Sequence, residues 1–195
     1  MHELLTLALL TLLGAMSPGP DFAIVARFAV TGCRKSALLA SLGIGLAILV
    51  HVTYCSLGVA VILSESKLLF RIIQIGGSLY LGYLGVYLLV KKNSKFTKQS
   101  SKKKPFVNGF LTNLLNPKAT IFILSLYTQF IDPKTPVFFL VLYGFTIFII
   151  TILWFFFLSF LMTHKALVPY FTQFQKYLMK MMGIVLIILA LTVLF

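Results

Sequence analysis

Two short proline-containing motifs carry most of the polar chemistry in a largely apolar sequence. The first reads Ser17-Pro18-Gly19-Pro20-Asp21, and the second reads Asn116-Pro117-Lys118, with Asn113 three residues earlier. Serine and asparagine are good N-cap residues, and proline is favoured at the first position of a helix. Proline also pushes the residue before it out of the α region. The motifs therefore predict half-helices starting at Pro18 and Pro117, each with free N–H groups and a positive dipole end.

Asp21 and Lys118 are the charged groups of these motifs, and each has two interpretations. A carboxylate at membrane depth usually belongs to a proton or substrate pathway. A first-turn acid can also simply complement the helix dipole at the water boundary. Lys118 opposes the dipole, so its stem extends to the surface or its ammonium faces an anion, such as a substrate carboxylate or Asp21. Asn113 and Asn116 are suited to capping and to hydrogen bonds between helices.

The composition predicts that these motifs lie in a membrane protein. Of 195 residues, 59% are hydrophobic and 11% are charged, whereas soluble domains are about 45–50% apolar and about 25% charged. A span needs roughly 20 apolar residues, and a barrel would show short alternating strands instead. The expected fold is therefore an all-α integral membrane protein with six transmembrane helices. The predicted spans are Leu4–Ile24, Leu38–Leu63, Leu68–Val90, Phe106–Ile131, Val137–Met162 and Leu178–Phe195.

The positive charges are distributed unequally over the connections between these spans. The chain has 17 Lys and Arg against 4 Asp and Glu, a net charge of +13. Thirteen of the bases fall in or beside the first, third and fifth connections, and three fall on the opposite face. The positive-inside rule places the odd-numbered connections in the cytoplasm and both termini outside. We interpret the basic run in the third connection as a topology signal beside anionic lipid, and not as a nucleic-acid patch.

The chain divides into two halves with the same pattern. Residues 1–90 and 106–195 each contain three predicted spans, and 91–105 joins them as a basic cytoplasmic loop. With three spans per half, the second half enters the membrane from the opposite side, which is the geometry of a 3+3 inverted repeat. Pro18 and Pro117 interrupt spans one and four at corresponding places. Paired interruptions of this kind indicate a transporter binding site; two ordinary proline kinks are the alternative.

Other kinds of site lack their signatures in this sequence. It contains no GxxxxGK[ST], HExxH or GxSxG motif, so neither an ATP-driven pump nor a hydrolase is indicated. The two cysteines, Cys33 and Cys55, have no metal-ligand spacing and form no disulfide framework. We therefore expect no enzyme activity, catalytic residue, metal or cofactor. His51 fits an interhelical hydrogen bond, and Gln129 fits either a packing contact or the lining of a transport route.

The motifs resemble, in order and spacing, the LysE/RhtB family of amino-acid exporters, and the similarity runs over nearly the whole chain. It is carried by Met16–Phe22, Gly43-Ile44, Gly76–Gly82, Gly85 and Gly109–Ala119. Within the family, Ser-Pro-Gly-Pro-Asp-Phe is most similar to the threonine and homoserine export branch. Family members often carry Asn at the position of Asp21, and a Pro-Gln-Phe sequence where this chain has Thr128-Gln129-Phe130.

The resemblance implies a multi-pass protein of the bacterial inner membrane that exports amino acids by proton antiport and works as a homo-oligomer, a dimer. We expect small neutral substrates similar to threonine or homoserine. The half-helix N-termini would receive the α-carboxylate, Asp21 would take the α-ammonium or a proton, and Lys118 would balance charge. The expected substrate-binding residues are Ser17, Pro18, Gly19, Pro20, Asp21, Asn113, Asn116, Pro117 and Lys118.

Two other classes of function are compatible with the same pattern. In the first, the paired half-helices meet as the pore of a passive channel for small solutes. In the second, the broken helices only pack against a partner, and the protein is a non-transporting membrane subunit.

Overall fold

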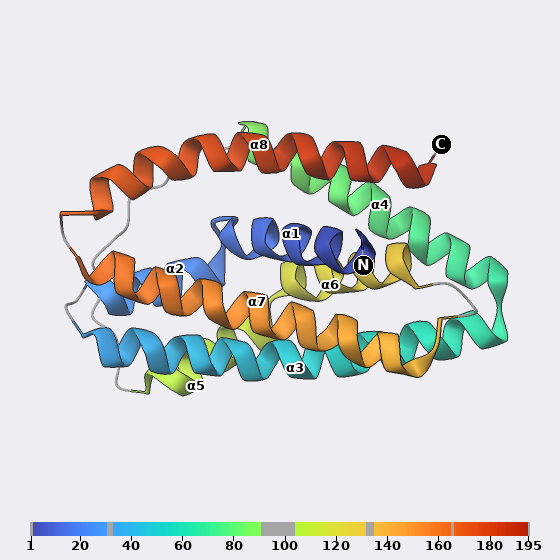
Figure 1. The fold of residues 1–195 in the computed structure, drawn as a ribbon, viewed down its shortest axis with the longest axis horizontal. Helices are drawn as coiled ribbons and strands as arrows, with labels where there is room; N and C mark the ends of the chain where they lie inside the picture. Colours follow the sequence, from blue (N-terminus) through green and yellow to red (C-terminus); the bar gives the residue numbers. More distant parts are fainter. Residues whose placement is uncertain (1, 31–32, 91–103, 132–134, 165, 195) are drawn as a thin grey trace.

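The computed structural model describes residues 2–30, 33–90, 104–131, 135–164 and 166–194, which form eight α-helices and no strand (Figure 1). The predicted all-α fold is therefore confirmed. The helices are α1 (His2–Met16), α2 (Pro20–Val30), α3 (Arg34–Glu65), α4 (Lys67–Val90), α5 (Pro105–Leu114), α6 (Pro117–Phe130), α7 (Val137–Thr163) and α8 (Val168–Leu194).

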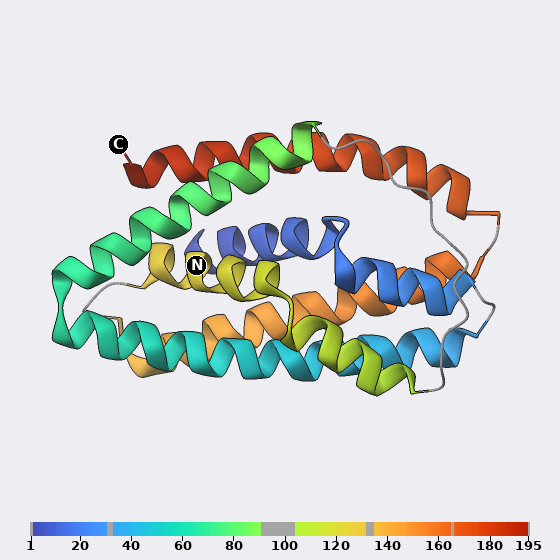
Figure 2. The ribbon, with the colours of Figure 1, turned by 180° about the vertical axis from the view of Figure 1, so that it is seen from behind.

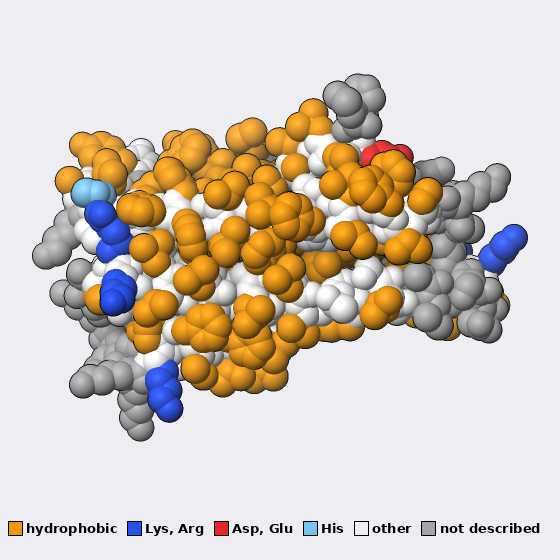
Figure 3. Space-filling model, turned by 60° about the horizontal axis from the view of Figure 1, so that its bottom comes forward, with side chains coloured by type: hydrophobic (Ala, Val, Ile, Leu, Met, Phe, Trp, Pro, Cys, Tyr) orange, Lys and Arg blue, Asp and Glu red, His pale blue; other side chains and the backbone are white. Residues whose placement is uncertain are grey.

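Several of these helices have the length and composition of membrane spans. Among the described residues, α3, α4 and α7 are long and apolar enough to cross a bilayer, and α1 with α2 makes a fourth candidate as a bent pair. Many large apolar side chains on the outside of the bundle are exposed, as expected for a surface that faces lipid. Figure 3 shows these side chains over the flank, with Lys and Arg side chains at the two ends. The arrangement as six spans in a 3+3 repeat stays a prediction.

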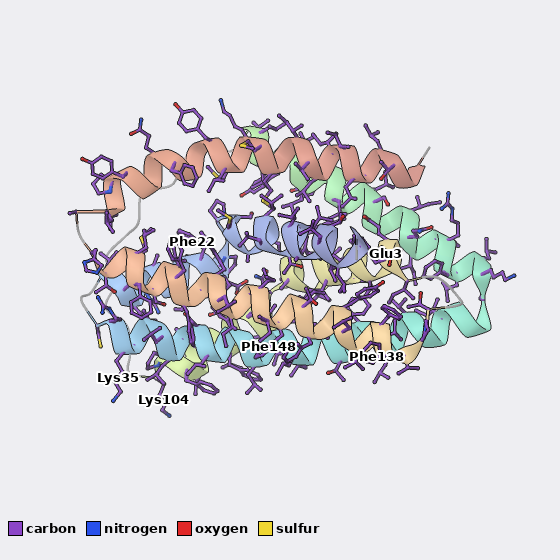
Figure 4. The ribbon with its side chains drawn as sticks, in the orientation of Figure 1. Glu3, Phe22, Lys35, Lys104, Phe138 and Phe148 are labelled. Atoms are coloured by element: carbon purple, nitrogen blue, oxygen red, sulfur yellow. The ribbon has the colours of Figure 1, made fainter. Side chains whose placement is uncertain are left out.

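The interrupted helices lie between two outer layers. In the two opposite views of Figures 1 and 2, α4 packs along α8 on one side, α3 packs with α5 and α7 on the other, and α1 and α6 lie between them. The segment α1–α2 runs toward the end that carries Lys35 and Lys104, and α5–α6 runs away from that end (Figures 2 and 4). Because α6 continues along the bundle after α5, the segment Phe106–Asn113 does not turn back as a re-entrant loop would.

Both predicted helix breaks are present, and one begins its helix at a different residue. α6 begins at Pro117 as predicted, and the Asn116 side chain caps it by accepting from the Lys118 backbone N at 3.1 Å. α2 begins at Pro20, not at the predicted Pro18, after a bend of 60° between α1 and α2. The reason is that Gly19, not Ser17, provides the first helical acceptor: its carbonyl accepts from the Ala23 N–H at 2.9 Å.

Other predicted boundaries shift by a few residues or more. The first interrupted segment continues to Val30 rather than ending at Ile24, and α8 begins at Val168, ten residues before the predicted Leu178. The predicted basic loop 91–105 lies outside the described residues as far as position 103. Its last residue, Pro105, is the first residue of α5, as suits proline at the first position of a helix.

Glycine allows α5 to lie directly against α3. A Cβ atom on Gly43 of α3 would collide with the backbone of Phe106 and Phe110, and one on Gly109 of α5 would collide with the backbone of Ala40. Small residues permit this kind of close backbone approach between membrane helices. The contact fixes the end of α5, which carries Asn113, against the middle of the bundle.

Candidate functional site

The two helix breaks face each other inside the bundle. The Asp21 Oδ2 atom of α2 accepts a hydrogen bond from Asn116 Nδ2 at 2.8 Å. A second bridge joins the same two breaks: the Lys118 ammonium of α6 donates to Ser17 Oγ at 2.6 Å and lies 3.5 Å from the Ser17 carbonyl oxygen. Residues about a hundred positions apart in the chain are thus joined by two polar bridges.

Asn116 is oriented by both of its amide atoms. Its Oδ1 accepts from the backbone N of Lys118 at 3.1 Å and caps α6, and its Nδ2 donates to Asp21. An N-cap side chain of this kind satisfies one of the orphan N–H groups at the start of a helix. The cap therefore also directs the amide donor at the carboxylate of the other break.

Lys118 points into the bundle instead of extending to the membrane surface. Its stem reaches to the connection between α1 and α2, where a Cβ on Gly19 would lie 3.4 Å from the ammonium nitrogen. The absence of a side chain at Gly19 leaves this space to Lys118. Of the two predicted interpretations, this geometry favours the inward-facing ammonium, whose contact here is Ser17, beside the break that carries Asp21.

A cavity of about 50 Å³ lies between the two breaks. This volume is well below the roughly 300–1,000 Å³ of a typical small-molecule pocket. As it stands the site is therefore too small for an amino acid, with room for little more than water. Its lining comes from both breaks and from α1, α3, α6 and α7, and includes Thr11, Gly14, Ser17, Gly19, Asp21, Ile48, Asn113, Asn116, Lys118, Phe122, Thr151 and Phe155.

Three oxygen atoms around the cavity are buried without a hydrogen-bond partner among the described residues. They are Asp21 Oδ1, Asn113 Oδ1 and Thr11 Oγ1. Leaving a buried polar group unsatisfied costs roughly 1–3 kcal/mol, so native structures rarely tolerate it without a reason. Two of the three can only accept hydrogen bonds, and the third can do both. The cavity therefore suits a guest that donates hydrogen bonds, such as an ammonium group or water.

Positive charge also lies at this cavity. The Lys118 ammonium is among its lining groups, and the N-terminal ends of α2 and α6, where the helix dipole favours anions, meet there. The site thus brings oxygen acceptors and a cationic group together in one small space.

The structure brings six of the nine predicted site residues to the cavity: Ser17, Gly19, Asp21, Asn113, Asn116 and Lys118. The three prolines are not among the described residues that line it; Pro20 and Pro117 begin their helices, and Pro18 lies in the connection. Their expected direct contact with a substrate has no support in this geometry.

Sequence reasoning missed the threonines and aromatic residues of the lining. Thr11 and Thr151 are buried polar residues in apolar helices. A threonine among apolar residues in a predicted span is a feature by which they could have been found from the sequence. Phe122 and Phe155 have no such signal, because a phenylalanine in a span is usually a packing residue.

His51 supports the second break from α3. It is fully buried, and its Nε2 lies 3.0 Å from the Asn113 carbonyl oxygen. A carbonyl can only accept, so Nε2 carries the proton in this contact. Its Nδ1 contacts the Tyr54 hydroxyl and lies 3.3 Å from Thr120 Oγ1. The predicted interhelical hydrogen bonding of His51 is confirmed, and its effect is to hold the end of α5 in place.

The described residues contain no cluster of three or more His, Cys, Asp or Glu side chains arranged to hold a metal ion. The polar groups at the breaks are amides, hydroxyls, one carboxylate and one ammonium. Such a set can bind a polar solute and exchange a proton.

Comparison with known proteins relates this chain to a family of translocators. A family model described as LysE type translocator matches residues 12–195. The threonine efflux protein of Salmonella typhimurium is 36% identical over 129 residues, which are 62% of this chain and 63% of that protein. The threonine efflux protein of Escherichia coli K12 is 35% identical over 130 residues, 63% of each chain.

The match to these two relatives spans less than two thirds of their length. An uncharacterized membrane protein of Haemophilus influenzae matches more of the chain, at 28% identity over 191 residues, which are 93% of this chain and 91% of that protein. No solved structure matches the chain. Because the family model extends from α1 through both breaks to the end of α8, the chain belongs to the LysE type translocator family.

Proposed function

We propose that this protein exports small neutral amino acids, similar to threonine or homoserine, from the bacterial cytoplasm in exchange for protons. The observation that carries the proposal is the cavity between the breaks, whose lining combines buried oxygen acceptors with the Lys118 ammonium and two helix N-termini. An α-amino acid is a zwitterion whose ammonium group matches the acceptors and whose carboxylate group matches Lys118. Its relatives named as threonine efflux proteins are consistent with such a substrate.

In this proposal each end of the substrate replaces a contact of the empty site. The α-carboxylate takes the place of the Ser17 hydroxyl at Lys118 and approaches the helix N-termini. The α-ammonium donates to Asp21 Oδ1 and Asn113 Oδ1, which have no partner among the described residues. The side chain then lies toward Thr11, Phe122 and Thr151, where the Thr11 hydroxyl favours a substrate that itself carries a hydroxyl.

The small volume of the empty cavity couples binding to movement. The bridges from Asn116 to Asp21 and from Lys118 to Ser17 hold the breaks together at about 50 Å³. A bound amino acid must separate the two breaks, and its charged groups then form hydrogen bonds in place of those that the two bridges lose. We propose that this separation rocks the half 1–90 against the half 106–195, as in alternating access.

Asp21 also accounts for the exchange with protons. A carboxylate can bind an ammonium or a proton, but the two compete because protonation removes the charge that attracts the ammonium. Proton entry at Asp21 would therefore release the amino acid, and substrate binding would release the proton. This mutual exclusion is the simplest basis for antiport at one residue.

The proposal is tested with purified protein in liposomes, by following efflux of labelled threonine under a pH gradient. The wild type should show saturable efflux that depends on the gradient. We expect Asp21→Asn to abolish gradient-driven efflux, whereas the matched acid-to-amide change Glu3→Gln, far from the cavity, should retain it. Unchanged gradient-driven efflux in Asp21→Asn would remove the proton role from this residue.

The same assay separates the other classes of function. Flux that neither saturates nor depends on the pH gradient would indicate a passive channel. Absence of any flux from the purified protein, with transport only after a second component is added, would indicate a non-transporting subunit.

We further propose the membrane arrangement that fits this function: a dimer in the inner membrane, with six spans, both termini outside and the basic end in the cytoplasm. The described Arg34, Lys35 and Lys104 are exposed at one end of the bundle, and Glu3 lies toward the other (Figure 4). This distribution supports the orientation expected from the positive-inside rule.

A further inference from the structure

A second cavity lies at the other end of the bundle from Lys35 and Lys104. Its volume is about 500 Å³, it is open to the outside, and it is lined by residues near the N-terminal ends of α1 and α4 and the C-terminal ends of α6 and α8. This volume is within the range of roughly 300–1,000 Å³ that small-molecule sites occupy. The lining residues are Thr6, Arg71, Gln74, Gln129, Phe130, Leu189 and Thr192.

Gln129 is one of the residues that line this cavity, and its amide has no hydrogen-bond partner among the described residues. Both its Nε2 and its Oε1 are buried, and neither has a hydrogen bond within the described part of the chain. A whole amide left unsatisfied in an apolar region is costly, because a donor and an acceptor are both desolvated. An apolar residue of similar size would pack better there, so packing alone does not explain a glutamine. The amide fits a guest that both accepts and donates hydrogen bonds.

Arg71 is held beside this amide by a short polar chain. Its guanidinium donates to Gln74 Oε1 at 2.7 Å, and Gln74 Nε2 donates to the Thr128 carbonyl oxygen at 3.0 Å. Thr128 directly precedes Gln129 on α6, so α4 and α6 together orient the guanidinium and the amide at one cavity. The planar fork of a guanidinium is well suited to a carboxylate.

We propose that this cavity is a second amino-acid site on the release side of the protein, where Arg71 binds the α-carboxylate and the Gln129 amide binds both charged ends. The inference rests on the proposed export function and adds to it a residue pair that acts after the substrate has left the site at the breaks. The site at the breaks is too small for an amino acid when empty, whereas this cavity is large enough to hold one in the same conformation.

A lipid phosphate offers Arg71 the same kind of oxyanion as an amino-acid carboxylate. The buried amide favours the amino acid, because a phosphate at Arg71 offers only acceptor oxygens and would leave Gln129 Oε1 without a donor. The two sources are separated by repeating the measurements below in liposomes with and without anionic lipid.

The test is exchange of labelled threonine in liposomes that contain protein in one orientation, assigned by reaction of the exposed Cys33 with an impermeant maleimide. Unlabelled threonine is varied separately on the Cys33 side and on the opposite side. We expect Arg71→Gln and Gln129→Leu to raise the half-saturating concentration on the opposite side by roughly tenfold or more, as for lost charged hydrogen bonds. On the Cys33 side the change should stay below about twofold.

Two controls distinguish binding from damage to the fold. Lys67→Gln removes an exposed charge at the start of α4 that is not among the lining residues, and it should leave both sides unchanged. Gln129→Leu should keep or raise the melting temperature in detergent, because it removes an unsatisfied buried amide. A Gln129→Leu protein that is both less stable and unchanged in exchange would assign glutamine a purely structural role and overturn the inference.

The remaining outcomes are equally decisive. Intact exchange with unchanged half-saturation in both variants overturns this inference and leaves the proposed function standing. A wild type that exchanges no amino acid overturns both. A shift that appears only with anionic lipid assigns the site to a lipid headgroup and overturns the amino-acid assignment.

Discussion

The cavity at the helix breaks and the cavity at the far end of the bundle differ in size, in charge and in how their polar groups are used. The inner one is about 50 Å³, with a carboxylate and an ammonium bridged across it to Asn116 and Ser17. The outer one is about 500 Å³, with a single arginine held by Gln74. The inner cavity is kept small by two hydrogen-bonded bridges whose partners a zwitterion could replace. The outer cavity already has room for a small molecule. In the proposed cycle, binding at the inner cavity must therefore separate the two breaks, whereas binding at the outer cavity need not.

Among the variants that compare the two cavities by exchange, Lys118→Ala should have the largest effect. Loss of its charged hydrogen bond removes roughly 1.5–3 kcal/mol from substrate binding at the breaks, equivalent to about 10- to 150-fold weaker exchange. Because every substrate passes this site, exchange should weaken from both sides of the membrane, unlike the one-sided effect of Arg71→Gln. The measurement is two-sided threonine exchange, with the exposed Lys104→Ala as the matched control. A fully active Lys118→Ala would remove this lysine from the substrate site.

Gly43→Ala should damage the inner cavity and spare the outer one. The added methyl collides with the α5 backbone, so α5 and Asn113 must shift, at a cost of roughly 1–3 kcal/mol in stability. Thermal unfolding in detergent and two-sided exchange report the two effects. Gly58→Ala is the control on the same helix, because, apart from the neighbouring backbone of α3 itself, no described atom lies within 4 Å of its Cβ position. Equal stability of the two variants would contradict the close packing of α3 and α5.

Thr11→Val should change preference rather than activity. The substitution keeps the shape of the side chain and removes a buried hydroxyl that lacks a partner among the described residues. We expect slightly higher thermal stability and a loss of roughly two- to tenfold in the preference for threonine over valine, as for one neutral hydrogen bond. Competition of unlabelled threonine and valine against labelled substrate measures it. Thr53→Val, whose hydroxyl bonds its own helix at Leu49, should leave the preference as it is.

The smallest expected effect is a change in the rate at which Cys33 is labelled. The same labelling shows which cavity faces the cytoplasm and which faces the outside. The hydrogen bond from Ser36 lowers the pKa of the Cys33 thiol, so more thiolate is present at a given pH than for a free cysteine. An impermeant maleimide should react from the cytoplasmic side, faster as pH rises, and Ser36→Ala should slow it a few-fold near neutral pH. The buried Cys55 should stay unlabelled. Reaction from the outside would reverse the orientation and exchange the roles of the two cavities.

Much of the site was predictable because helix ends depend on local chemistry. Asn116 and Pro117 begin α6 as their types require, and the polar residues beside both breaks are the ones that face the cavity. The choice between Pro18 and Pro20 as the start of α2 was not predictable in the same way. Both prolines satisfy the local rule, and the 60° bend that decides between them depends on how α1 and α2 pack against their neighbours.

By itself, the sequence determined an apolar, all-helical chain, the presence of a break in each half, and a short set of polar residues at those breaks. These properties depend on composition and on residues close together in the chain. The tertiary structure alone decided that Lys118 crosses to Ser17, that Thr11 and Thr151 join the cavity, and that Arg71 and Gln129 meet at another one. The reason is physical: each of these contacts joins helices that are distant in the sequence. The meeting of α4 and α6, for example, includes a close approach of Gly77 to Ser125 that a larger side chain would prevent.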